Sequence, residues 1–148
     1  MTDKSAEKHV MTDEPREFNV AIKWIEGPFG EVIVPGMPTI RTGMPPTYHT
    51  PEHLLVAAVI TCFMNSFVYF TRRMRIEFES FEAHGRGVLE RVGRSFEVAR
   101  IDVNAMVKVA DEALTKKIER ALELGGKYCF VGNSLKSSVK YDYEVVVA

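Results

Sequence analysis

The strongest feature of the hydrophobic pattern is a long apolar run over residues 54–70. Its polar positions are Thr61, Asn65 and Ser66. Thr50, Pro51 and Glu52 precede it as an N-cap, a first-turn proline and an acid beside the positive helix end. We therefore predict a helix that is buried on nearly all sides. The run is slightly shorter than the roughly 20 apolar residues of a membrane span, so a core helix is favoured over a span.

The remaining chain alternates between strand-forming runs and turns. Strands are predicted at residues 18–25, 31–34, 39–41, 76–90, 96–109 and 139–147. Apolar residues occupy alternate positions from Ile101 to Val109, which predicts a strand with one buried face. A second helix is predicted over residues 112–124, capped by Asp111 and ended by the pair Gly125 and Gly126. One or two further helical turns are expected within residues 128–137.

These elements predict an α+β fold in which an antiparallel sheet packs on a long, buried central helix. The length of 148 residues fits one domain, placed at residues 18–148. Residues 1–17 are polar with both signs of charge, so we expect a flexible N-terminal tail. So small a domain can hardly cover every face of an all-round apolar helix. A second copy of the chain is therefore expected to cover the rest.

Charge and cysteine content narrow the possible functions. The net charge is −1, so no basic excess supports a nucleic-acid or anionic-membrane surface. The basic residues at positions 72–75 follow the apolar run, where they complement the negative end of the helix. Two cysteines are too few for a disulfide scaffold, which indicates a reducing compartment. With no apolar segment in the first 17 residues to act as a secretory signal, we expect a cytoplasmic protein.

The two cysteines are the candidate chemical groups, although their spacing alone says little. Cys62 lies within the apolar helix and Cys129 lies 67 residues later, which matches neither a CxxC motif nor a zinc knuckle. One interpretation is two inert, buried thiols. The other is a reactive pair, since Cys129 is placed where a short helix could begin, and a helix N-terminus lowers a thiol pKa. Cys62 is mid-helix and would need a cation: Arg41, held by Glu52, is the candidate, and a solvated loop arginine is the alternative.

The segments around both cysteines resemble the OsmC/Ohr family. Residues 51–63, PEHLLVAAVITCF, are similar to that family's helix signature, with a Pro-Glu start and a cysteine ten positions after the glutamate. Cys129, followed by Val131, Asn133, Ser134 and Leu135, resembles its second cysteine motif. The order of elements also agrees from about Phe18 onward. Arg41 lies eleven residues before Glu52, which places the chain nearer the OsmC-like branch.

The resemblance implies an OsmC-like fold, an intertwined homodimer and a peroxidase mechanism without a cofactor. It implies that Cys62 is oxidised by an organic hydroperoxide to a sulfenic acid, which Cys129 converts to an intramolecular disulfide. An external dithiol would then reduce that disulfide. It also implies that Arg41 lowers the pKa of Cys62 and that Glu52 orients Arg41. Two departures, Phe130 in place of the usual proline and the residues 48–50 before Pro51, put the substrate in doubt.

Helix geometry adds one hypothesis about Glu52. Ten residues of α-helix separate Glu52 from Cys62, which is about 15 Å along the axis and about 80° around it. The two side chains cannot share a site on one straight helix. We therefore expect Glu52 to serve the Cys62 of a two-fold partner.

Alternative functions remain open at this stage. The i,i+4 pair His49 and His53 has a metal-compatible spacing, but no third ligand is near in sequence, so no metal is expected. An OsmC-like protein that binds a small apolar ligand with little peroxide turnover is the second interpretation, and an inert structural dimer is the third. The pKa of Cys62 distinguishes among them, because only a peroxidase requires a thiolate near neutral pH.

Overall fold

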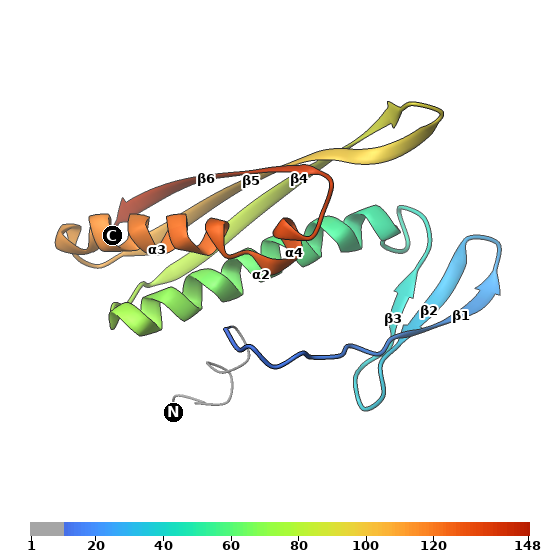
Figure 1. Ribbon diagram of the computed structural model, residues 1–148, viewed down its shortest axis with the longest axis horizontal. Helices are drawn as coiled ribbons and strands as arrows, with labels where there is room; N and C mark the ends of the chain where they lie inside the picture. The colour runs from blue at the N-terminus through green and yellow to red at the C-terminus, as the bar shows by residue number, and fades with distance from the viewer. Residues whose placement is uncertain (1–10) are drawn as a thin grey trace. The chain divides into compact units, whose positions relative to one another are not determined.

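The computed structural model describes residues 11–148, which form two compact units, residues 11–55 and residues 56–148. The predicted tail lies partly outside the described residues, since it includes residues 1–10. Its remaining residues, 11–17, are exposed and belong to no helix or strand. Figure 1 shows the elements in chain order, and each unit is considered by itself below.

The first unit is a small antiparallel sheet of three strands. They are β1 (Ala21–Glu26), β2 (Phe29–Ile33) and β3 (Ile40–Thr42), in the order β1-β2-β3. Gly27 turns the chain between β1 and β2 with a positive φ of 50°, a conformation that glycine adopts at no steric cost. Every residue of β1 is exposed in the single chain, including Ile22 and Trp24. The three strands match the predicted ones to within a few residues.

Helix α2 (Pro51–Met74) begins where the sequence predicts, because Thr50 caps it: its side-chain oxygen accepts a hydrogen bond from the His53 backbone N–H at 3.1 Å. It ends four residues later than predicted, at a left-handed Arg75 with φ of 56°. The buried residues of α2 form one stripe: Val59, Phe63, Ser66, Phe67 and Thr71. The predicted burial of α2 on nearly all sides is therefore not found within one chain, because the sheet covers only one face of the helix.

The length and composition of α2 would also suit a membrane span. Its apolar window has a mean hydropathy of 1.9 and is 28% buried. Core helices of soluble proteins meet the same criterion, and the buried stripe of α2 packs on a sheet with a conventional core. The helix by itself is therefore weak evidence for a membrane protein.

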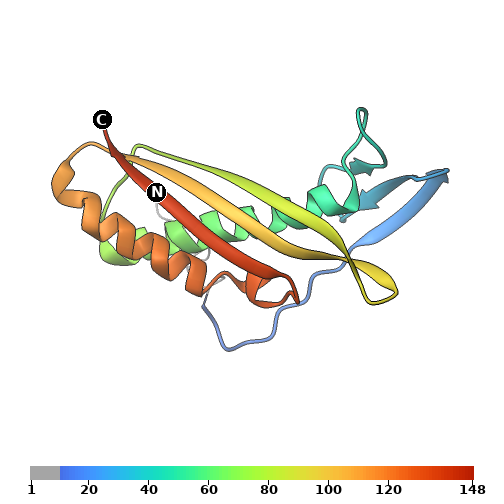
Figure 2. The same ribbon diagram turned by 90° about the horizontal axis from the view of Figure 1, so that it is seen from above.

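The second unit contains a three-stranded sheet of β4 (Ser80–Val92), β5 (Ser95–Val109) and β6 (Ser138–Val147). Strands β4 and β5 form the predicted antiparallel hairpin, but β6 pairs with β5 in parallel. The prediction of an antiparallel sheet is therefore wrong for this pair. The reason is the helical connection between β5 and β6, which returns the chain to the end of the sheet from which β5 starts. The three strands lie side by side in Figure 2.

The connection from β5 to β6 consists of a 3-10 turn, η1 (Glu112–Leu114), and the helices α3 (Thr115–Lys127) and α4 (Phe130–Asn133). Asp111 caps η1 as predicted, accepting a hydrogen bond from the Ala113 N–H at 2.9 Å. The glycine pair does not end α3, which continues to Lys127. Gly125 and Gly126 are buried instead, because a side chain at either position would meet the Phe67 backbone or the Tyr141 ring.

The core of this unit lies between the sheet and helices α2 and α3, which cover the same face of the sheet (Figures 1 and 2). The predicted alternation in β5 is confirmed. Its buried positions are Ile101, Val103, Ala105, Val107 and Val109. They pack with the α2 stripe and with Ile118, Ala121 and Leu122 of α3. This burial supplies the hydrophobic stabilisation that holds the two cysteine-bearing segments in place.

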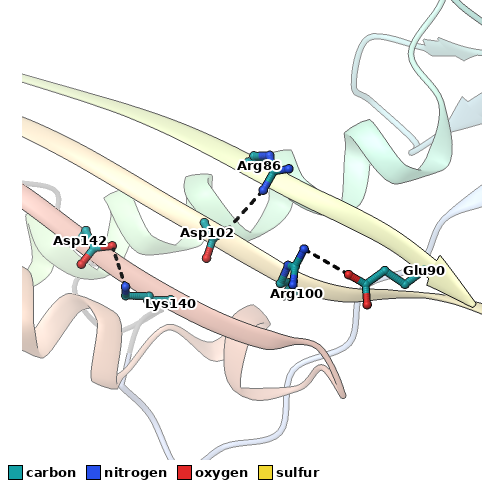
Figure 3. A network of polar contacts seen from close by, with 6 residues as sticks. All are labelled: Arg86, Glu90, Arg100, Asp102, Lys140 and Asp142. Carbon is teal, nitrogen blue, oxygen red and sulfur yellow. Dashed lines mark ion pairs between the residues drawn. The ribbon is translucent and has the colours of Figure 1, made fainter. Parts of the chain in front are cut away.

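The opposite face of the sheet carries charged pairs. Figure 3 shows Arg100 beside Glu90 at 3.2 Å, Lys140 beside Asp142 at 3.6 Å and Arg86 near Asp102 at 3.9 Å. All of these side chains are largely solvated, so each pair contributes at most about 1 kcal/mol. Their main consequence is that this face of the sheet is polar, which leaves the helical side as the apolar one.

Close contact between α2 and β4 depends on small residues in the strand. A Cβ at Gly85 would lie 2.7 Å from Val56 Cγ1 and 2.9 Å from Ile60 Cγ2, and one at Gly87 would lie 2.7 Å from Val56 Cγ2. We predict that Gly85→Ala lowers the free energy of unfolding by about 1–3 kcal/mol, because the helix must move away from the strand. Urea denaturation monitored by circular dichroism measures this loss.

The control for this substitution is Asn104→Ala, which changes the exposed residue paired with His84 on the same two strands. It should alter the free energy of unfolding by less than about 0.5 kcal/mol. Equal stability of Gly85→Ala and the wild-type chain would contradict the close approach.

Candidate functional site

The fold brings the two cysteines into contact although 67 residues separate them. Cys62 projects from α2, and Cys129 stands between α3 and α4, and both are free thiols. The Cys129 thiol lies within hydrogen-bonding reach of the Cys62 sulfur and of the Val59 carbonyl oxygen, the latter at 3.6 Å. Cys62 is partly exposed, whereas Cys129 is fully buried. A half-accessible sulfur backed by a buried one can form an intramolecular disulfide.

The position of Cys129 follows from how α3 ends. Tyr128 terminates α3, and the extended backbone of Cys129, with φ −74° and ψ 98°, starts the short helix α4. The Asn133 side chain donates a hydrogen bond to the Lys127 carbonyl at 3.0 Å, and the Ser134 hydroxyl donates one to the Phe130 carbonyl at 2.7 Å. These two bonds close the segment on itself and hold Cys129 against α2.

Local hydrogen bonds make Cys62 the acidic thiol of the pair. They lower its pKa from 9.0 to about 6, chiefly through a hydrogen bond from the Cys129 thiol to the Cys62 thiolate. The backbone N–H groups of Val131 and Phe130 at the start of α4 also donate to the thiolate, while partial burial opposes the shift. Cys62 is therefore the thiol of the pair that loses its proton first.

Cys129 behaves in the opposite way. Its hydrogen bond to Cys62 and its burial raise the pKa of its thiol, so it keeps its proton. The sequence analysis expected the helix start to activate Cys129 and a cation to activate Cys62. The first part is wrong, because the first N–H groups of α4 donate to the neighbouring Cys62 sulfur. The activation of Cys62 by a cation stays a prediction. No cation from residues 11–148 is among the causes of the Cys62 shift.

A third residue of the site, Tyr141 on β6, was missed by the sequence analysis. Its ring stacks on Phe63, with centroids 4.9 Å apart, and its hydroxyl oxygen is buried without a hydrogen-bond partner among the described residues. A Cβ at Gly132 would lie 2.2 Å from this oxygen and 3.3 Å from the Cys129 sulfur. Burial and the proximity of Cys129 raise the pKa of Tyr141, so its hydroxyl stays protonated. No local sequence signal distinguishes it from an ordinary core tyrosine.

The other two predicted site residues, Arg41 and Glu52, lie in the unit of residues 11–55. Arg41 lies on β3 opposite Glu31, and a hydrogen bond to Tyr48, followed by the charge of Glu31, raises its pKa. It lines a cavity of about 320 Å³ together with Phe29 and Tyr48. Glu52 lies in the first turn of α2. No ion pair joins Arg41 to Glu52 within residues 11–148 of one chain.

The histidine pair has a local structural role. His53 Nδ1 lies 2.9 Å from the Thr50 hydroxyl oxygen, at the start of α2, and the rings of His49 and His53 meet edge to face. Within residues 11–148, no cluster of three or more histidine, cysteine or acidic side chains could hold a metal ion.

Comparison with known proteins agrees with this arrangement. The family model of OsmC-like proteins matches residues 44–144, which is more than half of the chain, so the protein belongs to the OsmC-like family. The match includes both cysteines and Tyr141. No curated protein matches the chain.

Solved structures share the fold at low sequence identity. An OsmC-like protein of unknown function from Vibrio cholerae superposes with a TM-score of 0.77 at 18% identity, over 88% of this chain and 100% of that one. An organic hydroperoxide resistance protein of Legionella pneumophila gives 0.65 at 16%, over 89% and 99%. The organic hydroperoxide resistance protein OhrB of Bacillus subtilis gives 0.60 at 20%, over 86% and 98%.

The pKa difference between the thiols predicts selective alkylation. We expect the rate at which iodoacetamide modifies Cys62 to rise with pH with a midpoint near 6, as the thiolate forms. Cys129→Ala should move the midpoint upward by removing the main hydrogen-bond donor, and Cys129→Ser, which retains a donor, should move it less. Peptide mass analysis after a short exposure measures both. A midpoint near 9.0 in the unchanged protein would contradict the assignment.

The lowered pKa of Cys62 also determines how its contribution to the free energy of unfolding changes with pH. The folded pKa of Cys62 is below its ordinary value of 9.0, so its contribution to stability is present above that value and is lost as the pH falls through about 6. Between these limits the contribution of Cys62 to the free energy of unfolding therefore increases with pH.

Proposed function

We propose that this protein is a thiol-dependent peroxidase that reduces organic hydroperoxides. The observation on which the proposal rests is the pairing of a partly exposed Cys62 thiolate with a buried, protonated Cys129. A peroxidase needs a nucleophilic sulfur that the substrate can reach and a second thiol that resolves the product. If both thiols were inert core residues, hydrogen bonds that lower the pKa of Cys62 to about 6 would serve no purpose.

The reaction follows from the protonation states of the two sulfurs. The Cys62 thiolate attacks one oxygen of the O–O bond, forms Cys62 sulfenic acid and releases an alkoxide, which takes a proton to become the alcohol. The Cys129 sulfur then attacks the Cys62 sulfur, and the hydroxyl group leaves as water with the Cys129 proton. The product is a Cys62–Cys129 disulfide. An external dithiol restores both thiols and becomes oxidised itself, so the cycle needs no cofactor.

Two features support an organic rather than an inorganic peroxide. Phe130, whose backbone N–H donates to the Cys62 thiolate, has a large apolar side chain that is more than a third exposed in the single chain. An apolar surface next to the reactive sulfur favours a substrate with an alkyl group. The Legionella and Bacillus proteins of the same fold are named for resistance to organic hydroperoxides.

The proposed active form is a homodimer whose second chain supplies Glu52, with Arg41 as the cation beside the Cys62 thiolate. The single chain exposes a set of large apolar side chains that a folded protein normally covers. In the unit of residues 11–55 these include Phe18, Ile22, Trp24, Ile25 and Ile40. Arg41 and Glu52 also lie outside the unit that holds both cysteines. A cytoplasmic location, where a dithiol reductant is available, is consistent with this cycle.

A second candidate is an OsmC-like protein that binds a small apolar ligand without peroxide turnover. The cavity beside Arg41, with Ile25 and Phe29 in its wall, favours it. The two candidates differ in whether Cys62 is oxidised when a hydroperoxide is added.

We predict that cumene hydroperoxide or tert-butyl hydroperoxide, added in equimolar amount, converts the protein to the Cys62–Cys129 disulfide. Non-reducing mass analysis detects the loss of two hydrogens. Cys129→Ser should stop at the Cys62 sulfenic acid, trapped with dimedone, and Cys62→Ser should not react at all. If the unchanged protein keeps both thiols after exposure to excess hydroperoxide, the peroxidase proposal is wrong and ligand binding takes its place.

The shared site predicts complementation between inactive chains. We expect Cys62→Ser and Glu52→Ala homodimers each to lose most peroxidase activity. A verified heterodimer of the two contains one intact site, so it should recover up to about half of the wild-type activity. Turnover is followed with excess dithiol. Glu26→Ala, which removes an exposed acid from β1, is the control and should leave activity unchanged. A heterodimer as inactive as its parents would show that Glu52 does not act across the interface.

A further inference from the structure

The buried hydroxyl of Tyr141 is the polar group of the site that the proposed cycle leaves without a role. Its oxygen is shielded from solvent and has no hydrogen-bond partner among the described residues. A buried hydroxyl without a partner lowers the stability of the folded protein. Phenylalanine would keep the ring contacts and avoid this cost. An unpartnered buried hydroxyl therefore suggests another state of the protein, in which the Tyr141 hydroxyl donates a hydrogen bond to an acceptor.

The geometry around Tyr141 shows which acceptor is available. The ring is held on two sides, by its stack on Phe63 and by Gly126, where a Cβ would lie 3.0 Å from the Tyr141 ring. The hydroxyl oxygen and the Cys129 sulfur both border the small space above Gly132, where a single added carbon would meet both atoms. Gly132 is buried, so no side chain stands between them. The sulfur of Cys129 is thus a neighbouring group that can become an anion.

The accessibility of the two sulfurs decides when that anion forms. Cys62 is partly exposed and Cys129 is fully buried, so a dissolved thiol can approach only the Cys62 side of a disulfide between them. Attack on Cys62 expels Cys129 as the leaving thiolate. The Phe130 and Val131 N–H groups serve the Cys62 sulfur. The leaving Cys129 thiolate needs a different hydrogen-bond donor, and water cannot provide it because Cys129 is buried.

We propose that an external dithiol reduces the oxidised protein by attacking Cys62, and that the Tyr141 hydroxyl donates a hydrogen bond to Cys129 as it leaves. This inference deepens the proposed peroxidase cycle and rests on its Cys62–Cys129 disulfide. Tyr141 touches a reacting atom, so it is a catalytic residue of the reductive half of the cycle. It has no role in the attack of Cys62 on the peroxide.

The step balances as a thiol–disulfide exchange. A thiolate of the dithiol bonds to the Cys62 sulfur, the bond between Cys62 and Cys129 breaks, and its electron pair remains on Cys129. Tyr141 stabilises that charge until Cys129 takes the proton that the second thiol of the reductant gives up. The second thiol of the reductant then attacks the mixed disulfide, releases the Cys62 thiolate and leaves the reductant as a disulfide. The Tyr141 hydroxyl beside Cys129 acts to lower the pKa of the Cys129 thiol, against the larger effects that raise it, which is the sign that the role requires.

The test compares Tyr141→Phe with the unchanged protein, and Tyr143→Phe is the matched control. Tyr143 lies two residues further along β6, is exposed, and lines a cavity whose walls include neither cysteine. All three proteins are oxidised with diamide, which forms the disulfide without a peroxide. Dithiothreitol in excess then reduces them, and acid quenching, alkylation and mass analysis give the rate.

We expect Tyr141→Phe to slow reduction about tenfold, the effect of losing one hydrogen bond to a charged group. Tyr143→Phe should match the wild type. Sulfenic acid formation and the alkylation midpoint of Cys62 should be unchanged in both variants. The melting temperature of Tyr141→Phe should be equal or higher, since a buried hydroxyl without a partner is removed. Equal reduction rates, or an equal slowing of oxidation and reduction, would overturn the role of Tyr141.

A monothiol identifies which sulfur is attacked. The diamide-oxidised protein is treated briefly with 2-mercaptoethanol and the reaction is then quenched with acid. The 2-mercaptoethanol adduct should be found on the Cys62 peptide. An adduct on the Cys129 peptide would overturn the inference. These measurements are independent of peroxide. A protein that fails to react with hydroperoxide but shows the Tyr141 effect would refute the proposed function and leave the exchange step intact.

Discussion

The contact between helices α2 and α3 at Gly125 is the constraint that makes a site possible. A side chain at this position would meet the Phe67 backbone, so the absence of one allows the two helices to approach closely. Because α3 ends only two residues later, its close packing on α2 determines where Tyr128 and Cys129 lie. The buried faces of both helices and of β5 stabilise that packing. The meeting of two sulfurs far apart in sequence is a result of helix packing.

Within the site, a single proton distinguishes two chemically identical side chains. Cys129 keeps its proton because it is buried and because it donates to Cys62, and the same hydrogen bond makes Cys62 the thiolate. The first N–H groups of α4 add to the difference. In the proposed cycle, this difference in pKa makes Cys62 the attacking sulfur and Cys129 the resolving one. Arg41 and Glu52, if a second chain supplies them, would refine a thiolate that the hydrogen bonds already favour.

Local sequence signals predicted the elements, and tertiary contacts decided what they do. The Thr50 cap and the alternation in β5 are short-range patterns, and both are confirmed. The glycine pair at 125 and 126 has the appearance of a helix end, but its reason is helix–helix and helix–strand approach. The parallel pairing of β6 could not be inferred, because a single strand does not encode the direction of its partner. The direction of the α4 N–H groups and the position of Tyr141 depend on that same packing.

The parallel pairing of β6 also has a consequence for the order in which reactivity arises. Cys62 belongs to an early helix, whereas Cys129 and the α4 amides directly precede the last strand and Tyr141 lies on it. A nascent chain lacks the hydrogen bonds from Cys129, Phe130 and Val131 that lower the pKa of Cys62, since all three come from that late segment. The low pKa of Cys62 therefore arises only when the segment after α3 has packed against α2. On the proposed function, a chain that has not yet folded this segment carries a cysteine that is oxidised slowly.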